Sequence, residues 1–74
     1  MLLSDAVGGK KYKISKISYG ETLRKRLFDL GMTPSCVFIM INNTKKGPVL
    51  VQVRGTRVAM GRGMCKKIEV TEIE

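Results

Sequence analysis

Histidine and tryptophan are absent from this chain of 74 residues, and cysteine and proline occur only twice each. Without histidine, no serine or cysteine nucleophile can have an imidazole base beside it. The six carboxylates are scattered, with Glu69, Glu72 and Glu74 on a polar C-terminal stretch, so no pair is placed for acid–base catalysis. The segment Gly8-Gly9-Lys10-Lys11 lacks the glycine spacing of a phosphate-binding loop. We therefore expect no catalytic residues and no enzymatic activity.

The same scarcity of ligands argues against a metal centre. Ferrous iron is held mainly by imidazole and carboxylate groups, and zinc or copper sites use thiolates, but Cys36 and Cys65 lie far apart in the sequence. Met60, Met64 and Cys65 could gather as soft ligands. Methionine more often fills irregular gaps in a hydrophobic core, and that is the role we expect. The sequence predicts neither a bound metal nor another cofactor.

Two cysteines are too few for the disulfide framework of a small secreted domain, which indicates a reducing compartment. Both cysteines have apolar neighbours, so we expect buried and inert thiols. The first residues lack the basic and apolar regions of a signal peptide, and the longest apolar run, residues 37–41, is far too short to cross a bilayer. These features predict a cytoplasmic protein.

Positive charge is the most unusual feature of the composition. Fourteen Lys and Arg residues against six Asp and Glu residues give a net charge of +8. Such a field attracts acidic partners, which include nucleic acids, acidic protein surfaces and anionic membrane faces. Net charge also keeps small proteins soluble, so the charge alone does not select a partner.

The first part of the chain predicts a strand followed by a helix. After a short turn that begins at Leu3 and ends at Gly8-Gly9, residues 10–18 alternate as a strand does, and Ile17 breaks the alternation, which indicates a bulge or a strand end. Ser18 and Glu21 then have the spacing of a capping box.

The helix that follows is predicted over residues 21–30. Gly31 supplies the left-handed residue that ends it, and Pro34 prevents it from resuming. The predicted core-facing stripe consists of Leu23, Leu27 and Leu30.

From residue 37 the hydrophobic period changes to that of strands. Residues 37–41 are apolar on both faces, which predicts a strand covered on each side. After a polar turn over residues 42–47, Pro48 can begin a strand in which Val49, Val51 and Val53 face the core. Gly55-Thr56 is predicted as a tight turn.

The last third of the chain predicts two further short strands. Residues 57–60 form the first of them, residues 61–67 allow a turn that includes a short helical turn, and residues 68–71 alternate as a final strand. Five short strands and one helix are too few for a sheet covered on both faces. A single mostly β domain over residues 1–74, closed into a small SH3-like five-stranded barrel, removes the exposed edges.

Several motifs resemble those of the ferrous-iron-transport protein A family, and the resemblance covers nearly the whole chain. The motifs are Leu3-Ser4 before Gly8-Gly9, Tyr12-x-Ile14-x-x-Ile17, Arg26-Leu27-x-x-Leu30-Gly31-Met32-x-Pro34, Gly47-Pro48-Val49-x-Val51-x-Val53-x-Gly55, Val58-Ala59-Met60 and Lys67-Ile68-x-Val70. The resemblance implies an SH3-like barrel. It also implies a small cytosolic accessory protein of bacterial ferrous iron uptake, acting with a membrane permease that carries a cytoplasmic G-protein domain (FeoB-like), so that the chain lies near the membrane only through its partner.

The chain departs from the family pattern at two places. Ser35 stands where the family usually has glycine, which is expected to alter the turn but not the fold. Residues 60–65 replace a segment that is usually acidic and alanine-rich, and the glycines Gly61 and Gly63 weaken a helix there by about 1 kcal/mol each. The edge formed by this segment is therefore expected to be basic.

The predicted partner-binding residues lie outside the expected core. On the helix, Arg24, Lys25 and Phe28 lie away from the leucine stripe, so Phe28 either anchors a partner or is covered by the N-terminal segment. Leu50 on an outward strand face is a further candidate. Basic residues of the loops are expected to gather at one end of the barrel, and they are Lys45, Lys46, Arg54, Arg57 and Arg62.

Three functions remain open at the level of the sequence. The first is a protein–protein adaptor of the ferrous iron permease. The second is a nucleic-acid-binding small barrel, which the positive charge favours. Against it, two Tyr, two Phe and no Trp leave few aromatic rings on which bases could stack. The third is a detached regulatory domain of a metal-responsive repressor, against which the absence of DNA-binding helices argues. The sequence does not determine the oligomeric state.

Overall fold

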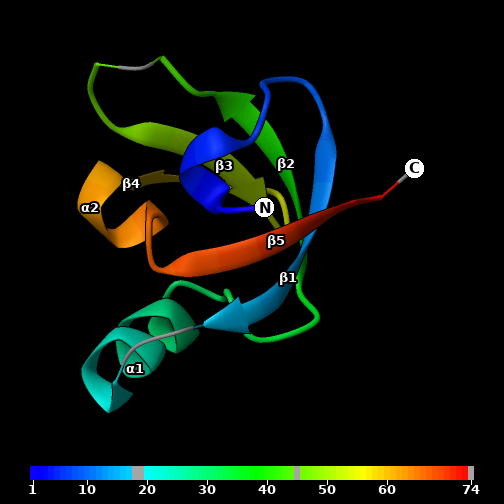
Figure 1. Cartoon of the computed structure of the whole chain (residues 1–74). Coiled ribbons are helices and arrows are strands. Elements are labelled where there is room, and N and C mark those ends of the chain that lie inside the picture. The colour runs from blue at the N-terminus through cyan, green and yellow to red at the C-terminus, as the bar shows by residue number, and fades with distance from the viewer. Residues whose placement is uncertain (18–19, 45, 74) are drawn as a thin grey trace.

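The computed structural model describes residues 1–17, 20–44 and 46–73, and in these ranges it contains five strands, two α-helices and one 3-10 turn (Figure 1). The elements in chain order are η1 (Leu3–Asp5), β1 (Lys11–Ile17), α1 (Glu21–Asp29), β2 (Val37–Asn42), β3 (Val49–Val53), β4 (Thr56–Met60), α2 (Arg62–Cys65) and β5 (Ile68–Ile73). The predicted mostly β, SH3-like fold with its helix between the first two strands is confirmed.

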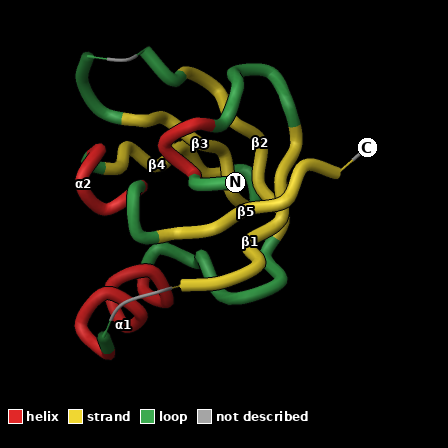
Figure 2. The backbone as a smooth tube through the Cα atoms, in the orientation of Figure 1, coloured by secondary structure: helices red, strands yellow, loops and turns green. Residues whose placement is uncertain are grey.

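The strands form one antiparallel sheet in the order β4-β3-β2-β1-β5. This sheet curls around the core, and η1 lies over its open side (Figures 1 and 2). Within the described ranges, β4 and β5 form the two edges and do not pair with each other, so backbone closure does not remove the edges as predicted. Instead the N-terminal residues cover β5, because Leu2 bridges to Glu69 and the Val70 N–H donates to the Met1 carbonyl at 2.7 Å.

The core consists of side chains from every strand, and it follows the alternation of the sequence. Val49, Val51 and Val53 of β3 are buried as predicted, and Leu50 and Gln52 between them are half-buried. The rings of Tyr12 and Phe38, on paired positions of β1 and β2, stack with their centroids 6.0 Å apart. The Tyr12 hydroxyl accepts a hydrogen bond from the Val7 N–H at 2.8 Å, which pairs the phenol oxygen inside the fold and fastens the N-terminal segment.

Strand β2 is covered on one face only, so the prediction of a strand covered on both faces is wrong. Phe38 and Met40 are buried, whereas Val37 and Ile39 are 44% and 38% exposed. Figure 1 shows α1 and α2 at a distance from β2, and neither helix covers this exposed face. The apolar residues on both faces of this segment predicted a strand covered on each side, but one face of β2 is exposed to solvent.

The bulge predicted at Ile17 lies two residues earlier. The pairing of β1 with β5 shifts between Ile14 and Lys16, which leaves Ser15 as the extra residue. Beyond the shift, Ile17 pairs with Ile68 and is buried like Ile14. The broken alternation in the sequence therefore reflects both a bulge at Ser15 and the end of β1, whose last residue is Ile17.

Helix α1 has Gly20 as its N-cap, with no side-chain cap hydrogen bond, and Ser18 of the predicted capping box lies outside the described residues. At the C-terminus, Gly31 has φ +85° as predicted. The Met32 N–H donates to the Leu27 carbonyl at 2.8 Å and the Gly31 N–H to the Phe28 carbonyl at 2.9 Å, the two bonds of a Schellman motif.

The predicted leucine stripe is only partly right. Leu27 is fully buried and Leu23 packs partly against the core, but Leu30 is the C-cap and is 37% exposed. Met32 is fully buried instead, because the Schellman turn brings the chain back under the helix.

The hairpin between β3 and β4 turns at Arg54-Gly55, one residue before the predicted Gly55-Thr56. Both residues have positive φ, +51° and +80°, as a two-residue type I′ turn requires, and Val53 pairs with Thr56 across it. The predicted helical turn before the last strand is confirmed as α2.

Candidate interaction surfaces

No group of three or more His, Cys, Asp or Glu side chains that could hold a metal ion occurs among the described residues. Of the three soft groups considered above, Met60 and Cys65 are buried in the core and Met64 packs partly against it. Their surroundings are those of core side chains. No helix in the described ranges has the length and apolar character needed to span a membrane.

The two cysteines differ in exposure. Cys65 is fully buried, and this burial raises the pKa of its thiol to about 11, although the nearby Arg62 charge acts in the opposite direction. Cys36 is only half-buried, so the prediction that both thiols are buried is wrong for this one. Its Sγ–H donates to the Gly31 carbonyl at 3.5 Å, next to the end of α1.

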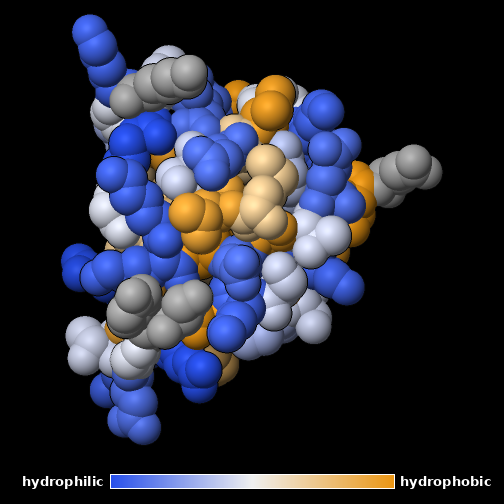
Figure 3. All heavy atoms as spheres, in the orientation of Figure 1, coloured by the Kyte–Doolittle hydropathy of each residue, from blue (hydrophilic) through white to orange (hydrophobic). Residues whose placement is uncertain are grey.

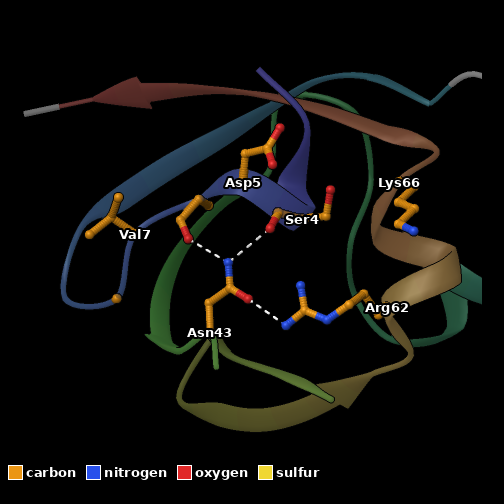
Figure 4. Close-up of a pocket in the computed structure, with 8 residues that line it drawn as sticks. Ser4, Asp5, Val7, Asn43, Arg62 and Lys66 are labelled. Atoms are coloured by element: carbon orange, nitrogen blue, oxygen red, sulfur yellow. Dashed lines mark hydrogen bonds between the residues drawn. The ribbon is translucent and has the colours of Figure 1, made fainter. Parts of the chain in front are cut away.

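A polar cluster joins three segments that are distant in the sequence (Figure 4). The Asn43 Nδ2 donates to the carbonyls of Ser4, at 3.0 Å, and Ala6, at 2.6 Å. The Asn43 Oδ1 accepts a hydrogen bond from Arg62 at 2.8 Å, and the same Arg62 nitrogen donates to the Thr44 carbonyl. We call Asn43 and Arg62 the clamp, because they hold the η1 segment, the β2–β3 loop and α2 together.

The clamp lies beside a hollow of about 570 Å³, whose lining residues include Asp5, Val7 and Lys66 (Figure 4). The hydrogen-bonding atoms of the Asn43 amide are all engaged by protein groups, and Arg62 already binds two acceptors. The Arg62 Nε is buried and has no hydrogen-bond partner among the described residues. Because the hydrogen bonds of Asn43 and Arg62 go to other parts of the protein, the clamp has a structural role.

Sequence reasoning placed Arg62 on a binding surface and read Asn43 as one residue of a polar turn. An asparagine in a turn is common, and nothing in its immediate neighbours indicates a bond to residues 37 or 39 positions away. The sequence held only an indirect signal for these bonds. Residues 3–9 form no strand, so their backbone carbonyls need hydrogen-bond donors from elsewhere, such as a side chain.

Phe28 is the most exposed of the large apolar side chains that the structure describes, with 68% of its surface exposed. The described N-terminal segment does not cover it: η1 and α1 lie on opposite sides of β5 in the view of Figures 1 and 2. Phe28 borders a groove of about 290 Å³ whose described lining residues are Ile17, Arg24, Phe28, Met32, Thr33 and Pro34. We call this the Phe28 groove.

The other predicted binding residues are not brought to this groove. Lys25 lines a separate hollow on α1 with Glu21 and Asp29. Leu50 is half-buried, and Arg57 is exposed on β4.

The predicted gathering of loop cations at one end of the barrel is wrong for its described members. Arg54 is in the β3–β4 turn. Arg62 contacts the β2–β3 loop at the opposite end of β3, where Lys46 is exposed. Lys45 lies outside the described residues. The positive charge is therefore spread over the surface, and Figure 3 shows hydrophilic residues around most of one face, with apolar atoms at its centre near the N-terminus.

Comparison with known proteins gives one family and one fold. The FeoA domain family matches residues 1–72. The Fe(2+) transport protein A of Methanocaldococcus jannaschii is 32% identical over 72 residues, which are 97% of this chain and 87% of that protein.

Two solved structures illustrate the range of the fold. A crystal structure of an iron uptake regulatory protein (FeoA) superposes with a TM-score of 0.93 at 27% identity, covering 99% of this chain and 97% of that one. A manganese-dependent transcriptional repressor superposes with a TM-score of 0.88 at 15% identity, over 99% of this chain but 41% of that one. The second likeness shows a shared fold alone.

Proposed function

Because this chain belongs to the FeoA family, a family of small proteins related to ferrous iron transport, we propose that it acts as an accessory protein of ferrous iron uptake. In this proposal, residues 1–74 form one domain that binds the cytoplasmic part of a ferrous iron permease, the part that carries a G-protein domain. The chain works from the cytoplasm by contact with that partner and catalyses no reaction itself.

The observation that carries the proposal is the match over nearly the full length of both chains, to a protein named for Fe(2+) transport and to a FeoA structure. The surface supports a binding role. Phe28 is a largely exposed aromatic side chain beside a groove, and aromatic side chains often anchor protein–protein contacts. The +8 charge adds a preference for an acidic partner surface.

The test is a calorimetric titration of the purified chain into the cytoplasmic domain of the permease, at low and at moderate salt, with and without guanine nucleotide. We expect saturable binding that weakens as salt rises but persists at 150 mM. Absence of binding at low salt would contradict the proposal. A parallel measurement of ferrous iron uptake, in cells with and without the chain, checks that the contact matters for transport.

The nucleic-acid alternative loses support from the positions of the aromatic rings. Tyr12 and Phe38 are buried in the core, and Tyr19 lies outside the described residues. Phe28 is then the exposed aromatic among the described residues, and it lies on a helix rather than on a strand face where bases stack. Binding to an oligonucleotide that disappears at moderate salt would indicate attraction between charges alone.

A further inference from the structure

We propose that the Phe28 groove receives one bulky apolar side chain from an acidic segment of the partner. This inference rests on the proposed function and specifies the surface through which the chain docks. The groove lies between the last turns of α1 and the segment from Met32 to Pro34, at the end of β1.

The walls of the groove are held in place by the backbone. Arg24 and Phe28 are four residues apart on α1, so their side chains are neighbours on the helix surface. The Schellman bonds fix Met32 under the helix, and the Cys36 N–H donates to the Thr33 carbonyl at 2.9 Å, which closes the next turn. A groove with rigid walls loses little conformational entropy when a partner binds.

The size and composition of the groove favour a side chain over a small molecule. Its volume of about 290 Å³ is at the bottom of the range of about 300–1,000 Å³ that is typical of ligand pockets. Its described lining is mostly apolar, with Arg24 as the charged residue. One buried apolar anchor flanked by a cation is the usual composition of a strong contact in a protein interface.

The distribution of charge identifies the partner segment as acidic. No carboxylate is among the described residues that line the groove, and the chain as a whole carries a net charge of +8. On α1, Asp29 points about 100° away from Phe28, and Glu21 lies one turn N-terminal to Arg24, on the side of Arg24 away from Phe28. An acidic group beside the apolar anchor would therefore pair with Arg24 from the side that faces Phe28.

The test compares two variants in the groove with two matched variants outside it, by titration against the cytoplasmic domain of the permease. Phe28→Ala removes the exposed aromatic wall, and Arg24→Glu reverses the charge of the rim. The controls are Ile39→Ala, which removes an exposed apolar side chain from the outer face of β2, and Lys11→Glu, which reverses an exposed charge on β1. Thermal unfolding of all four variants checks that the fold is kept.

We expect Phe28→Ala to weaken binding at least tenfold, with the two controls within threefold of the parent chain. Arg24→Glu should weaken binding about tenfold at low salt and less as salt rises, because salt screens the pairing.

The outcomes separate this inference from the proposed function. If the parent chain binds and Phe28→Ala binds equally well, or if Ile39→Ala is the variant that weakens binding, the groove is not the docking surface and the proposed function stands. If the parent chain does not bind at all, the proposed function is wrong, and the inference about the groove is wrong as well.

Discussion

Replacement of Asn43 by alanine is expected to be one of the most destabilising single changes outside the apolar core. The side chain donates two hydrogen bonds to the carbonyls of Ser4 and Ala6 and accepts one from Arg62. Alanine leaves two partly buried carbonyls and a guanidinium nitrogen with fewer partners. Its neighbour Asn42, the last residue of β2, is exposed, so Asn42→Ala is the matched control.

The magnitude follows from the bonds that are lost. Each neutral hydrogen bond contributes about 1 kcal/mol net and a bond to a charged group about 1.5–3 kcal/mol, so Asn43→Ala should cost about 2–4 kcal/mol after allowance for partial exposure. A domain of this size is stable by about 4–11 kcal/mol in total. The expected decrease in melting temperature is therefore about 10–25 °C. Asn42→Ala should change the free energy of unfolding by less than about 0.5 kcal/mol.

The assay is chemical denaturation of the parent chain and both variants, with the dependence on denaturant checked to be unchanged. If Asn43→Ala is within 0.5 kcal/mol of Asn42→Ala, the clamp does not hold the segments together. Asn43→Asp tests the role of the amide itself. It keeps the acceptor for Arg62 but places a carboxylate oxygen against two carbonyls, so it should also destabilise the fold, and a fully stable Asn43→Asp variant would refute the assignment of the two donated bonds.

Four further predictions concern backbone angles and burial. Ser35 has φ +71°, where a residue other than glycine is strained, so Ser35→Gly should raise the free energy of unfolding by about 0.5–1 kcal/mol, whereas Ser15→Gly in β1 should lower it by a similar amount. Arg54 has φ +51° in the type I′ turn, and Arg54→Asn should raise the melting temperature by a few degrees, while an unchanged or lower value would argue against this turn. Because burial raises the pKa of Cys65 to about 11, mass spectrometry of alkylated native protein at pH 8 should find Cys36 labelled well before Cys65. The unfolded thiol ionises near pH 9, so stability from the neutral buried thiol should fall between pH 9 and 11 by roughly 1 kcal/mol per pH unit, and Cys65→Ala should flatten this slope.

Local patterns in the sequence predicted most of the elements, because their causes are local. The helix at residues 21–30 was predicted from its period and from Gly31, and the structure has it over Glu21–Asp29. The valines of β3 were predicted to face the core from simple alternation, and all three are buried. The break in alternation near Ile17 correctly announced a bulge, although its position depends on the pairing with β5, which the sequence of one strand does not contain.

The wrong predictions share a cause, which is that they concern contacts between segments. Whether β2 is covered on one face or two depends on where α1 packs, and periodicity does not specify that. Leu30 fits the helical stripe in the sequence, yet it is partly exposed, and the Schellman turn buries Met32 instead. The bonds of Asn43 connect residues nearly forty positions apart, so they were invisible to any local pattern.

The fold alone cannot decide the function of this chain, since the same barrel is found at 15% identity in a manganese-dependent transcriptional repressor. What a barrel of this kind does must then depend on side chains that its core does not require. Leu27 and Met32 are fully buried and would be needed in any relative that keeps this helix, whereas Phe28 between them is largely exposed and contributes little to folding. A side chain that the core does not require is available for a contact, and aromatic side chains are enriched among the residues that carry binding energy. Phe28→Ala is for this reason expected to weaken the proposed contact while it leaves the free energy of unfolding nearly unchanged.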